Sequence, residues 1–416
     1  MGKKFKVVTL GCRTNQYESQ AYTDQLLQLG YRKAQEAEEV DLCIVNTCTV
    51  TASADSSSRH EIRSLARQYP GAKIVVTGCL AEQLTAMPGV SLIVPNAQKE
   101  ELLNLALPEE EIPEFAISHF EAHTRAFVKV QDGCNAFCTY CIIPYVRGRS
   151  RSRKLDEILE EVKNLVHNGF KEVVLTGINI GDFDGNSSEG QPPVRLAELV
   201  RAVDAIPGLE RLRISSIDPD EVDEELLEAV VNGKHTCPSM HIVLQSGSNA
   251  ILKRMNRKYT KEIFLNTVER LKNAKPDFTF TTDVIVGFPG ESEQDFQETL
   301  EMLSEVEFAK VHMFPYSRRE RTRAALYPHQ VPKEVMQERK QRVLRQAEEI
   351  AFSLRERYVG QRRSVLVESE DSAGQMSGHT DNFLTVVVEG DKSLANTLVE
   401  VKLLSNAPHA LIGKVL

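Results

Sequence analysis

Three of the eight cysteines in this 416-residue chain lie within one short segment, GCNAFCTYC, as Cys134, Cys138 and Cys141. Their spacing is Cys-x3-Cys-x2-Cys. Three thiolates in one tight loop can bind three irons of a cubane 4Fe–4S cluster, which leaves the fourth iron open for a small ligand. A structural zinc site is the alternative, but zinc would need a fourth Cys or His at finger-like spacing, and none follows closely. The segment therefore favours an iron–sulfur loop.

The composition indicates a soluble globular protein. Hydrophobic residues make up 41% of the chain and charged residues 26%, and no apolar run approaches the roughly 20 residues of a membrane span. The segment from Met1 to Cys12 has too few consecutive apolar residues for a signal-peptide core. We therefore expect a cytoplasmic protein with no membrane contact. Because disulfides are rare in the cytosol, its clustered thiols indicate metal binding or catalysis.

The first section of the chain alternates short apolar strands with helices, which predicts a parallel sheet with helices on both faces. The acidic, proline-containing segment 107–115 then interrupts the pattern and indicates a linker. We assign residues 1–115 to an N-terminal α/β domain. Its expected strands are 6–10, 42–46, 73–77 and 92–94, and its expected helices include 18–29 and 54–69.

A second series of strands and helices begins at Ala126. Six strand–helix units in about 200 residues fit an incomplete barrel better than an eight-fold one, so residues 120–348 are predicted to form a partial (β/α)6 barrel. A charged helix at about 333–357 leads into residues 350–416, where consecutive strands expected at 364–368, 383–388 and 398–404 predict a small antiparallel β-barrel. The predicted fold class is α/β plus a small all-β domain. The strands of the partial barrel are expected at 127–130, 172–176, 211–215, 241–245, 279–286 and 310–314.

Three further cysteines, far apart in the sequence, each follow a predicted strand of the first domain. They are Cys12 in TLGC, Cys48 in VNTC and Cys79 in VTGC. Because the loops at the carboxyl ends of parallel strands lie on one edge of the sheet, these thiols can converge on a second three-thiolate cluster. Cys43 lies inside a strand and is assigned to the core, since free cysteine is among the most buried residue types.

GCNAFCTYC resembles the signature of the radical-SAM superfamily, in which an aromatic residue, here Tyr140, precedes the last cysteine. Two triads in this order, followed by a β-rich tail, resemble the methylthiotransferase branch over essentially the whole chain. The resemblance implies two 4Fe–4S clusters and S-adenosylmethionine as cofactors, and a TRAM domain at the end that recognises the substrate. The first triad would hold an auxiliary cluster that takes part in sulfur delivery, and the central triad would hold the cluster that makes the radical.

By the same resemblance, one S-adenosylmethionine supplies a methyl group, a second supplies a 5′-deoxyadenosyl radical, and an adenine gains a methylthio group at carbon 2. An unactivated C–H carbon justifies radical chemistry, because acid–base groups cannot overcome its barrier. The implied partners are the anticodon stem-loop of a tRNA, a sulfur donor and an electron donor such as flavodoxin.

Loop sequences distinguish the branches of this family. GCRTNQYESQ, NTCTVTASADSSSR and LTGINIGDF resemble the branch that modifies N6-threonylcarbamoyladenosine next to the anticodon. The isopentenyladenosine branch usually has Gln-Met-Asn after its first cysteine, and the branch that modifies a ribosomal-protein aspartate usually has Pro-Lys-Asn. Here Arg13-Thr14-Asn15 follows, with Arg13 where the favoured branch usually has Lys. A non-catalytic iron–sulfur RNA-binding or electron-transfer protein is the alternative of another class, but it would not explain the open-iron triad.

Several strand ends of the barrel are candidate cofactor-binding positions, because such positions carry the catalytic residues of barrels. TDVIVGFPGES resembles the superfamily motif that contacts adenine, and the Thr-Gly after the second strand resembles the strand end that meets the methionine amino group. A glycine after a strand often serves only the turn, which is the alternative. The candidates are Tyr140, Thr176, Gly177, Ser215, Gln245, Asp283, Val286 and Gly287.

The formal net charge of −9 argues against a basic nucleic-acid surface over the whole protein. Two runs of cations are local exceptions, RGRSRSRK shortly after Cys141 and SRRERTR at 317–323. Cations near the cluster loop could bind anticodon phosphates, or they could simply be solvated. Relatives commonly carry Gly-Thr in the second run, so Glu320 and Arg321 are a departure. The RNA-binding candidates are Arg147, Arg149, Arg151, Arg153, Arg362 and Arg363.

Overall fold

The computed structural model describes residues 2–36, 38–120, 124–185, 192–370 and 374–416. Contacts divide the chain into two compact units. Unit 1 comprises Met1–Glu121, Asp132–Arg151 and Ser317–Ala325, and unit 2 comprises Ala122–Gln131, Ser152–Tyr316 and Leu326–Leu416. The central cysteine loop therefore belongs to the same compact unit as the N-terminal residues.

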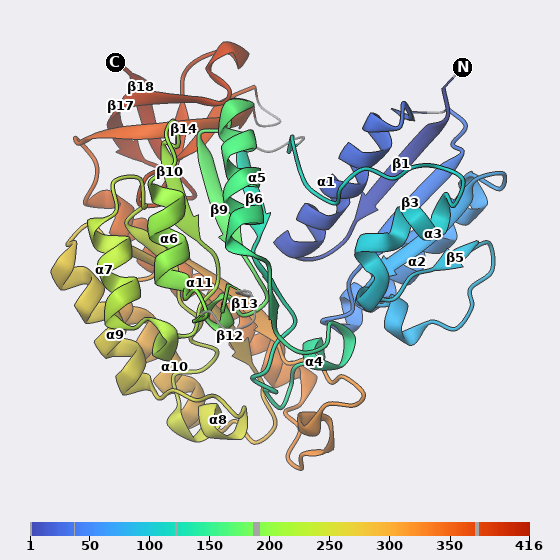
Figure 1. Cartoon of the computed structure of the whole chain (residues 1–416). Coiled ribbons are helices and arrows are strands. Elements are labelled where there is room, and N and C mark those ends of the chain that lie inside the picture. Colours follow the sequence, from blue (N-terminus) through green and yellow to red (C-terminus); the bar gives the residue numbers. More distant parts are fainter. Residues whose placement is uncertain (1, 37, 121–123, 186–191, 371–373) are drawn as a thin grey trace. The chain divides into compact units, whose positions relative to one another are not determined.

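Unit 1 is built on a five-stranded parallel sheet in the order β2-β1-β3-β4-β5, drawn in blue in Figure 1. Four of its strands overlap the predicted ones. The additional strand, β2, is an exposed dipeptide with no apolar pattern to reveal it. The strands are β1 (Lys4–Thr9), β2 (Arg32–Lys33), β3 (Leu42–Thr47), β4 (Lys73–Gly78) and β5 (Leu92–Ile93), and the helices are α1 (Arg13–Gln28), α2 (Ala52–Gln68), η1 (Ala81–Gln83), η2 (Asn96–Glu101), α3 (Leu102–Ala106) and α4 (Ile143–Val146).

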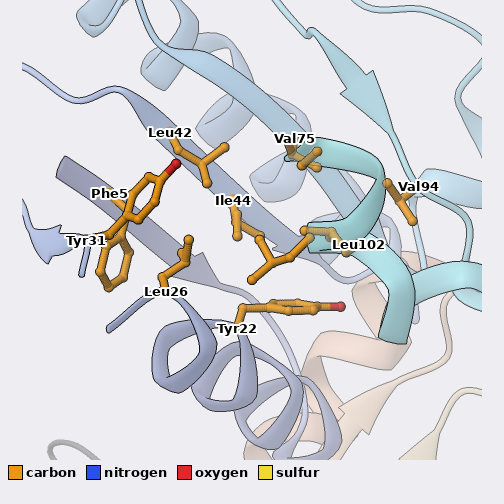
Figure 2. Packing of buried hydrophobic residues seen from close by; sticks show 11 residues of the cluster. Phe5, Tyr22, Leu26, Tyr31, Leu42, Ile44, Val75, Val94 and Leu102 are labelled. Carbon is orange, nitrogen blue, oxygen red and sulfur yellow. The ribbon is translucent and has the colours of Figure 1, made fainter. Parts of the chain in front are cut away.

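Alternating residues of β3 enter two different cores, because successive side chains of a strand point to opposite faces of the sheet. Leu42 and Ile44 pack with Tyr22 and Leu26 of α1, as Figure 2 shows. Cys43 and its neighbours on the other face pack in a second cluster with the apolar side of α2. Cys43 is fully buried there, in agreement with its assignment to the core. Helices thus cover both faces of the sheet and leave its edge at the strand ends for the cysteines.

Unit 2 contains six barrel strands near the expected positions, and they form two three-stranded parallel sheets in the orders β10-β9-β6 and β11-β12-β13. The strand expected at 241–245 is shifted toward the N-terminus and overlaps its prediction only at His241. Single parallel bridges such as Ile217↔Ile242 link the two sheets into a partial barrel. The strands are β6 (Arg125–Lys129), β9 (Glu172–Thr176), β10 (Arg211–Ile214), β11 (Ser239–His241), β12 (Thr279–Val286) and β13 (Lys310–Pro315). The helices around them are α5 (Leu155–His167), α6 (Leu196–Asp204), α7 (Glu224–Asn232), α8 (Asn249–Arg254), α9 (Lys261–Ala274), α10 (Glu293–Val306) and α11 (Lys333–Glu356) (Figure 1).

The C-terminal part of unit 2 is a closed five-stranded barrel in the order β14-β15-β16-β18-β17. The sequence predicts three of these strands and an antiparallel barrel. One pair, β16–β18, is instead parallel, because β17 lies between the two in sequence and pairs antiparallel with β14 and β18, so that β18 runs in the same direction as β16. Phe383, expected inside a strand, has a left-handed backbone (φ 65°) and precedes β16. The strands are β14 (Arg362–Glu370), β15 (Met376–Thr380), β16 (Thr385–Val388), β17 (Thr397–Asn406) and β18 (Leu411–Val415).

The described helices give no candidate for a membrane span, since none combines sufficient length with sufficient hydropathy.

Candidate iron–sulfur and cofactor sites

Three neighbouring strands of unit 1 bring Cys12, Cys48 and Cys79 to one edge of the sheet. Cys48 directly follows β3 and Cys79 directly follows β4, and the Cys79 amide donates to the carbonyl of Thr47 at 3.0 Å. Cys12 follows β1, the strand on the other side of β3. A Cβ built on Gly11 would lie 2.9 Å from the Cys48 sulfur. The fold therefore gathers three thiols from distant parts of the sequence.

The electrostatics of this triad fit a metal-bound state. Cys48 and Cys79 are 5% and 2% exposed, whereas Cys12 is exposed. Burial is the main cause that raises the pKa of the Cys48 thiol and, to about 11, that of Cys79; neighbouring cysteine charges act in the same direction, whereas the Arg147 guanidinium acts in the opposite one. Such thiols stay protonated at neutral pH unless a cation is bound, and a coordinated metal deprotonates them outright. The donor set thus fits an iron–sulfur cluster.

No three described His, Cys, Asp or Glu side chains are arranged to hold a single metal ion. A cubane does not require that arrangement, because each thiolate binds a different iron.

A buried ionic network borders Cys79, and none of the sequence patterns predicts it. The Arg147 guanidinium donates to the Cys79 sulfur at 3.3 Å, to Glu18 at 3.1 Å and to Asp132 at 2.9 Å. Lys99 of η2 pairs with Glu18 at 2.6 Å and also with Asp132. All four charged side chains are at most 5% exposed. No periodic pattern marks these residues, so only the fold reveals them.

The central triad lies on an irregular loop. The Cys134 amide donates to Gly148 O at 3.1 Å, so the loop closes on itself, and the Cys141 amide donates to Cys138 O at 3.0 Å. The Ala136 amide donates to the Cys134 sulfur at 3.4 Å, a contact that stabilises a thiolate. Cys138 is buried, while Cys134, Cys141 and the adjacent Tyr140 are half-buried. Three sulfurs within one turn-rich loop fit three irons of a cubane.

The segment 317–325 contacts both cysteine loops within unit 1. Arg319 donates to Thr49, next to Cys48, at 2.7 Å, and the Ala324 amide donates to the Thr139 carbonyl at 2.8 Å. Arg321, part of the departure noted in the sequence, has a left-handed backbone (φ 71°) and lies over the ring of Tyr145 at 5.3 Å. The second run of cations is therefore partly structural.

Two of the predicted cofactor positions in unit 2 carry buried polar atoms that lack a hydrogen bond to any described residue. These atoms are Ser215 Oγ, after β10, and Gln245 Oε1, after β11. The residues are 3% and 9% exposed. Gln245 also has a left-handed backbone (φ 61°), a conformation that persists only where its surroundings enforce it and that clusters at ligand sites. Unsatisfied buried polar atoms are costly, so both positions fit a polar ligand.

The other predicted cofactor positions of unit 2 have contacts within that unit. A Cβ on Gly177, after the buried Thr176 of β9, would lie 2.8 Å from the side-chain oxygen of Gln131, so close packing requires a glycine there. A Cβ on Gly287 would lie 2.1 Å from Met336 of α11. The remaining two are on β12: the Asp283 carboxylate lies 3.4 Å from His241 Nε2, and the Val286 side chain is fully buried.

One of the predicted RNA-binding residues does not lie at the surface. Arg147 was expected among surface cations, but its side chain is 0% exposed and is bound to buried carboxylates and to Cys79. Arg153 and Arg363 are ion-paired with Glu161 and Asp277.

The remaining RNA-binding candidates are accessible. Arg149 and Arg362 are exposed, and the Arg151 side chain is 47% exposed although it contacts Asp132 at 3.0 Å. Arg149 stacks over the ring of Phe137 at 4.5 Å, which holds its charge beside the central cysteine loop.

Comparisons with known proteins match all three sections of the chain. Residues 4–88 match the uncharacterized protein family UPF0004, residues 128–303 the Radical SAM superfamily, and residues 356–416 the TRAM domain. A threonylcarbamoyladenosine tRNA methylthiotransferase MtaB of Chlamydia pneumoniae is 49% identical, with 99% of this chain and 98% of the relative covered. The protein of the same name from Bacillus subtilis is 37% identical (95% and 92% covered). A tRNA-2-methylthio-N(6)-dimethylallyladenosine synthase of Caldicellulosiruptor saccharolyticus is 36% identical (100% and 93% covered).

Solved structures support the fold. The radical S-adenosylmethionine methyltransferase TsrM from Kitasatospora setae superposes with a TM-score of 0.55 at 14% identity, covering 75% of this chain and 73% of its own. At that identity the similarity concerns the arrangement of the elements alone.

Proposed function

Since the chain belongs to the radical-SAM methylthiotransferase family, we propose that it transfers a methylthio group to carbon 2 of N6-threonylcarbamoyladenosine next to the anticodon of tRNA. The observation that carries the substrate is the 49% identity, over nearly the full length of both chains, to a relative named for that nucleoside. Relatives named for dimethylallyladenosine reach 34–37%. A tRNA substrate would place the reaction in the cytoplasm.

The cofactors of such an enzyme are 4Fe–4S clusters and S-adenosylmethionine. We assign one cluster to Cys12, Cys48 and Cys79 and a second to Cys134, Cys138 and Cys141. When bound, the central cluster supplies the electron that cleaves S-adenosylmethionine to a 5′-deoxyadenosyl radical, and the auxiliary cluster takes part in delivering sulfur.

The residues of the chain position these groups. The amide of Ala136 stabilises the Cys134 thiolate, and the irregular loop presents its three sulfurs together. We assign polar contacts with S-adenosylmethionine to Ser215 and Gln245, because their buried oxygen atoms are unsatisfied. Thr176, Gly177, Asp283, Val286 and Gly287 line strand ends of the same partial barrel and complete the proposed cofactor site. For tRNA phosphates we propose the exposed Arg149, Arg151 and Arg362.

Nucleoside mass spectrometry tests the substrate. We expect tRNA from a deletion strain to lack 2-methylthio-N6-threonylcarbamoyladenosine and to contain the unmethylthiolated nucleoside instead, with the isopentenyl-type methylthio nucleoside unchanged. Complementation with the wild-type gene should restore the product, whereas a Cys134→Ala gene should not. The opposite pattern, an unchanged threonylcarbamoyl product with a lost isopentenyl product, would assign the chain to the other branch.

A further inference from the structure

Arg147 differs from Arg149 and Arg151, the exposed arginines of the same sequence run. It follows α4, the short helix after Cys141, and its side chain is completely buried. Its Nε donates to the Cys79 sulfur at 3.3 Å, its Nη1 donates to Glu18 and Asp132, and its Nη2 donates to Asn15 Oδ1. One guanidinium therefore joins the segment after the central triad to a cysteine of the N-terminal triad.

Apolar contacts connect the same two segments independently. Cys79 packs against Ile142 and Val146, which flank and end α4, in one buried cluster. The side-chain amide of Asn96 donates to the Val146 carbonyl at 2.6 Å. The position of Arg147 is therefore fixed by the surrounding backbone and not only by its own ion pairs.

The buried charges around Arg147 balance one another, so the hydrogen bond from Arg147 to the Cys79 sulfur is not needed to neutralise a charge. Glu18 and Asp132 supply two buried negative charges, and Lys99 and Arg147 supply two buried positive charges. Arg151 also binds Asp132, at 3.0 Å, but it is half-exposed and its other hydrogen bond is to the Arg147 carbonyl. Arg147 and Arg151 thus share a carboxylate partner, while Arg147 also reaches a cysteine.

A permanent cation that donates to a ligand sulfur changes the chemistry of a bound cluster. Arginine stays protonated in proteins, and each added electron makes a cluster more negative. Hydrogen bonds to the sulfurs and nearby positive charge therefore favour the reduced state and raise the reduction potential. The buried setting strengthens the effect, because charges interact more strongly in a low dielectric.

We propose that Arg147 is a positioning residue of the N-terminal cluster, which holds Cys79 against the segment that follows the central triad and raises the reduction potential of the cluster bound there. The inference rests on the proposed function, because it requires that Cys12, Cys48 and Cys79 hold a cluster.

An EPR-monitored redox titration tests the proposal on the full chain. Cys134, Cys138 and Cys141 are replaced by Ala, so that the signal arises from the N-terminal cluster, and Arg147→Gln, Arg147→Lys and the matched control Arg151→Gln are added singly. At the midpoint potential of the parent, Arg147→Gln should raise the ratio of oxidised to reduced cluster at least tenfold. For a one-electron couple, a tenfold change corresponds to a midpoint reduction potential that is lower by 59 mV. Arg147→Lys should cause a smaller shift in the same direction, and Arg151→Gln should change the ratio less than twofold.

Four outcomes separate the possibilities. Equal shifts for Arg147→Gln and Arg151→Gln, or no shift in Arg147→Gln at full iron content, would overturn the proposal. If Arg147→Gln takes up no iron, the Arg147→Lys variant tests the proposal instead. A change of less than twofold in its ratio of oxidised to reduced cluster would then overturn the proposal. If the parent with intact Arg147 binds no cluster, the assignment of Cys12, Cys48 and Cys79 fails, which is a failure of the proposed function.

Discussion

Cys12, Cys48 and Cys79 come from the ends of three strands, whereas Cys134, Cys138 and Cys141 come from a single loop of the same compact unit. The sheet edge buries two of its three cysteines, while the loop leaves two of its three half-buried. Burial raises the pKa of the sheet-edge thiols Cys48 and Cys79. A more enclosed site protects a cluster from solvent, and a more open one admits a cofactor and a substrate.

A glycine with a left-handed backbone precedes a cysteine in both triads. Gly11, Gly78 and Gly133 have φ values of 100°, 88° and 72°. A Cβ on Gly78 would lie 2.4 Å from the Thr47 carbonyl, and one on Gly133 would lie 2.0 Å from the Arg149 carbonyl. Both triads therefore have a left-handed glycine that turns the chain sharply before a cysteine.

The largest expected effect comes from removing either triad. Replacing Cys134, Cys138 and Cys141 with Ala should remove about four irons of about eight and should abolish both 5′-deoxyadenosine release and methylthio product. Replacing Cys12, Cys48 and Cys79 with Ala should remove a similar amount of iron and abolish the methylthio product, but should leave deoxyadenosine release measurable. Iron analysis and chromatography of the reaction mixture distinguish the two variants.

The control for this comparison is Cys43→Ala, which removes a buried cysteine of the core and should leave the iron content unchanged. A wild-type protein that binds only about four irons after anaerobic reconstitution would contradict the assignment of two clusters.

An intermediate effect is expected from the glycines. Gly78→Ala and Gly133→Ala should each lower the free energy of unfolding by more than the ~1–3 kcal/mol that an unfavourable backbone conformation costs, because carbonyl oxygens occupy the space of the new Cβ. Each variant should also lose iron from its own triad. Urea denaturation and iron analysis measure both effects.

Gly30→Ala is the matched control, since Gly30 has a φ of 80° but no atom within 4 Å of the new Cβ. It should show the backbone strain alone, with full iron content. If Gly30→Ala destabilises the protein as much as Gly133→Ala, the close approach in the cluster loop has no energetic consequence.

The smallest effect concerns the exposed arginine beside the loop triad. Arg149→Gln should weaken tRNA binding roughly threefold to tenfold, as expected for the loss of one phosphate contact. The slope of log K against the logarithm of the salt concentration should become shallower by about 1. Fluorescence anisotropy over a series of salt concentrations measures both quantities. Arg345→Gln, at an exposed position of α11, is the control, and an equal loss of affinity in that variant would argue against a phosphate contact by Arg149.

Much of the architecture could be predicted from the sequence because it is encoded locally. The strands of the parallel sheet and of the partial barrel are apolar runs between turn residues, and each predicted strand overlaps an observed one, the strand predicted at 241–245 by one residue only. The exceptions are short or depend on pairing: β2 is two exposed residues, and the parallel β16–β18 pair depends on the path of β17. Local patterns contain no information about such long-range pairing.

The candidate site divides in the same way. The sequence by itself identified the six cysteines as candidate cluster ligands, because their spacing in the loop and their positions after strands are local features. Only the tertiary structure decided that Arg147 is buried while Arg149, two residues away, is exposed. It also decided that Glu18, Lys99 and Asp132 surround Arg147. Whether the Arg147 side chain is solvated or paired depends on a residue more than a hundred positions away in the sequence, Glu18. The local sequence around Arg147 does not specify that contact, because it forms only when the sheet and the loop have folded together.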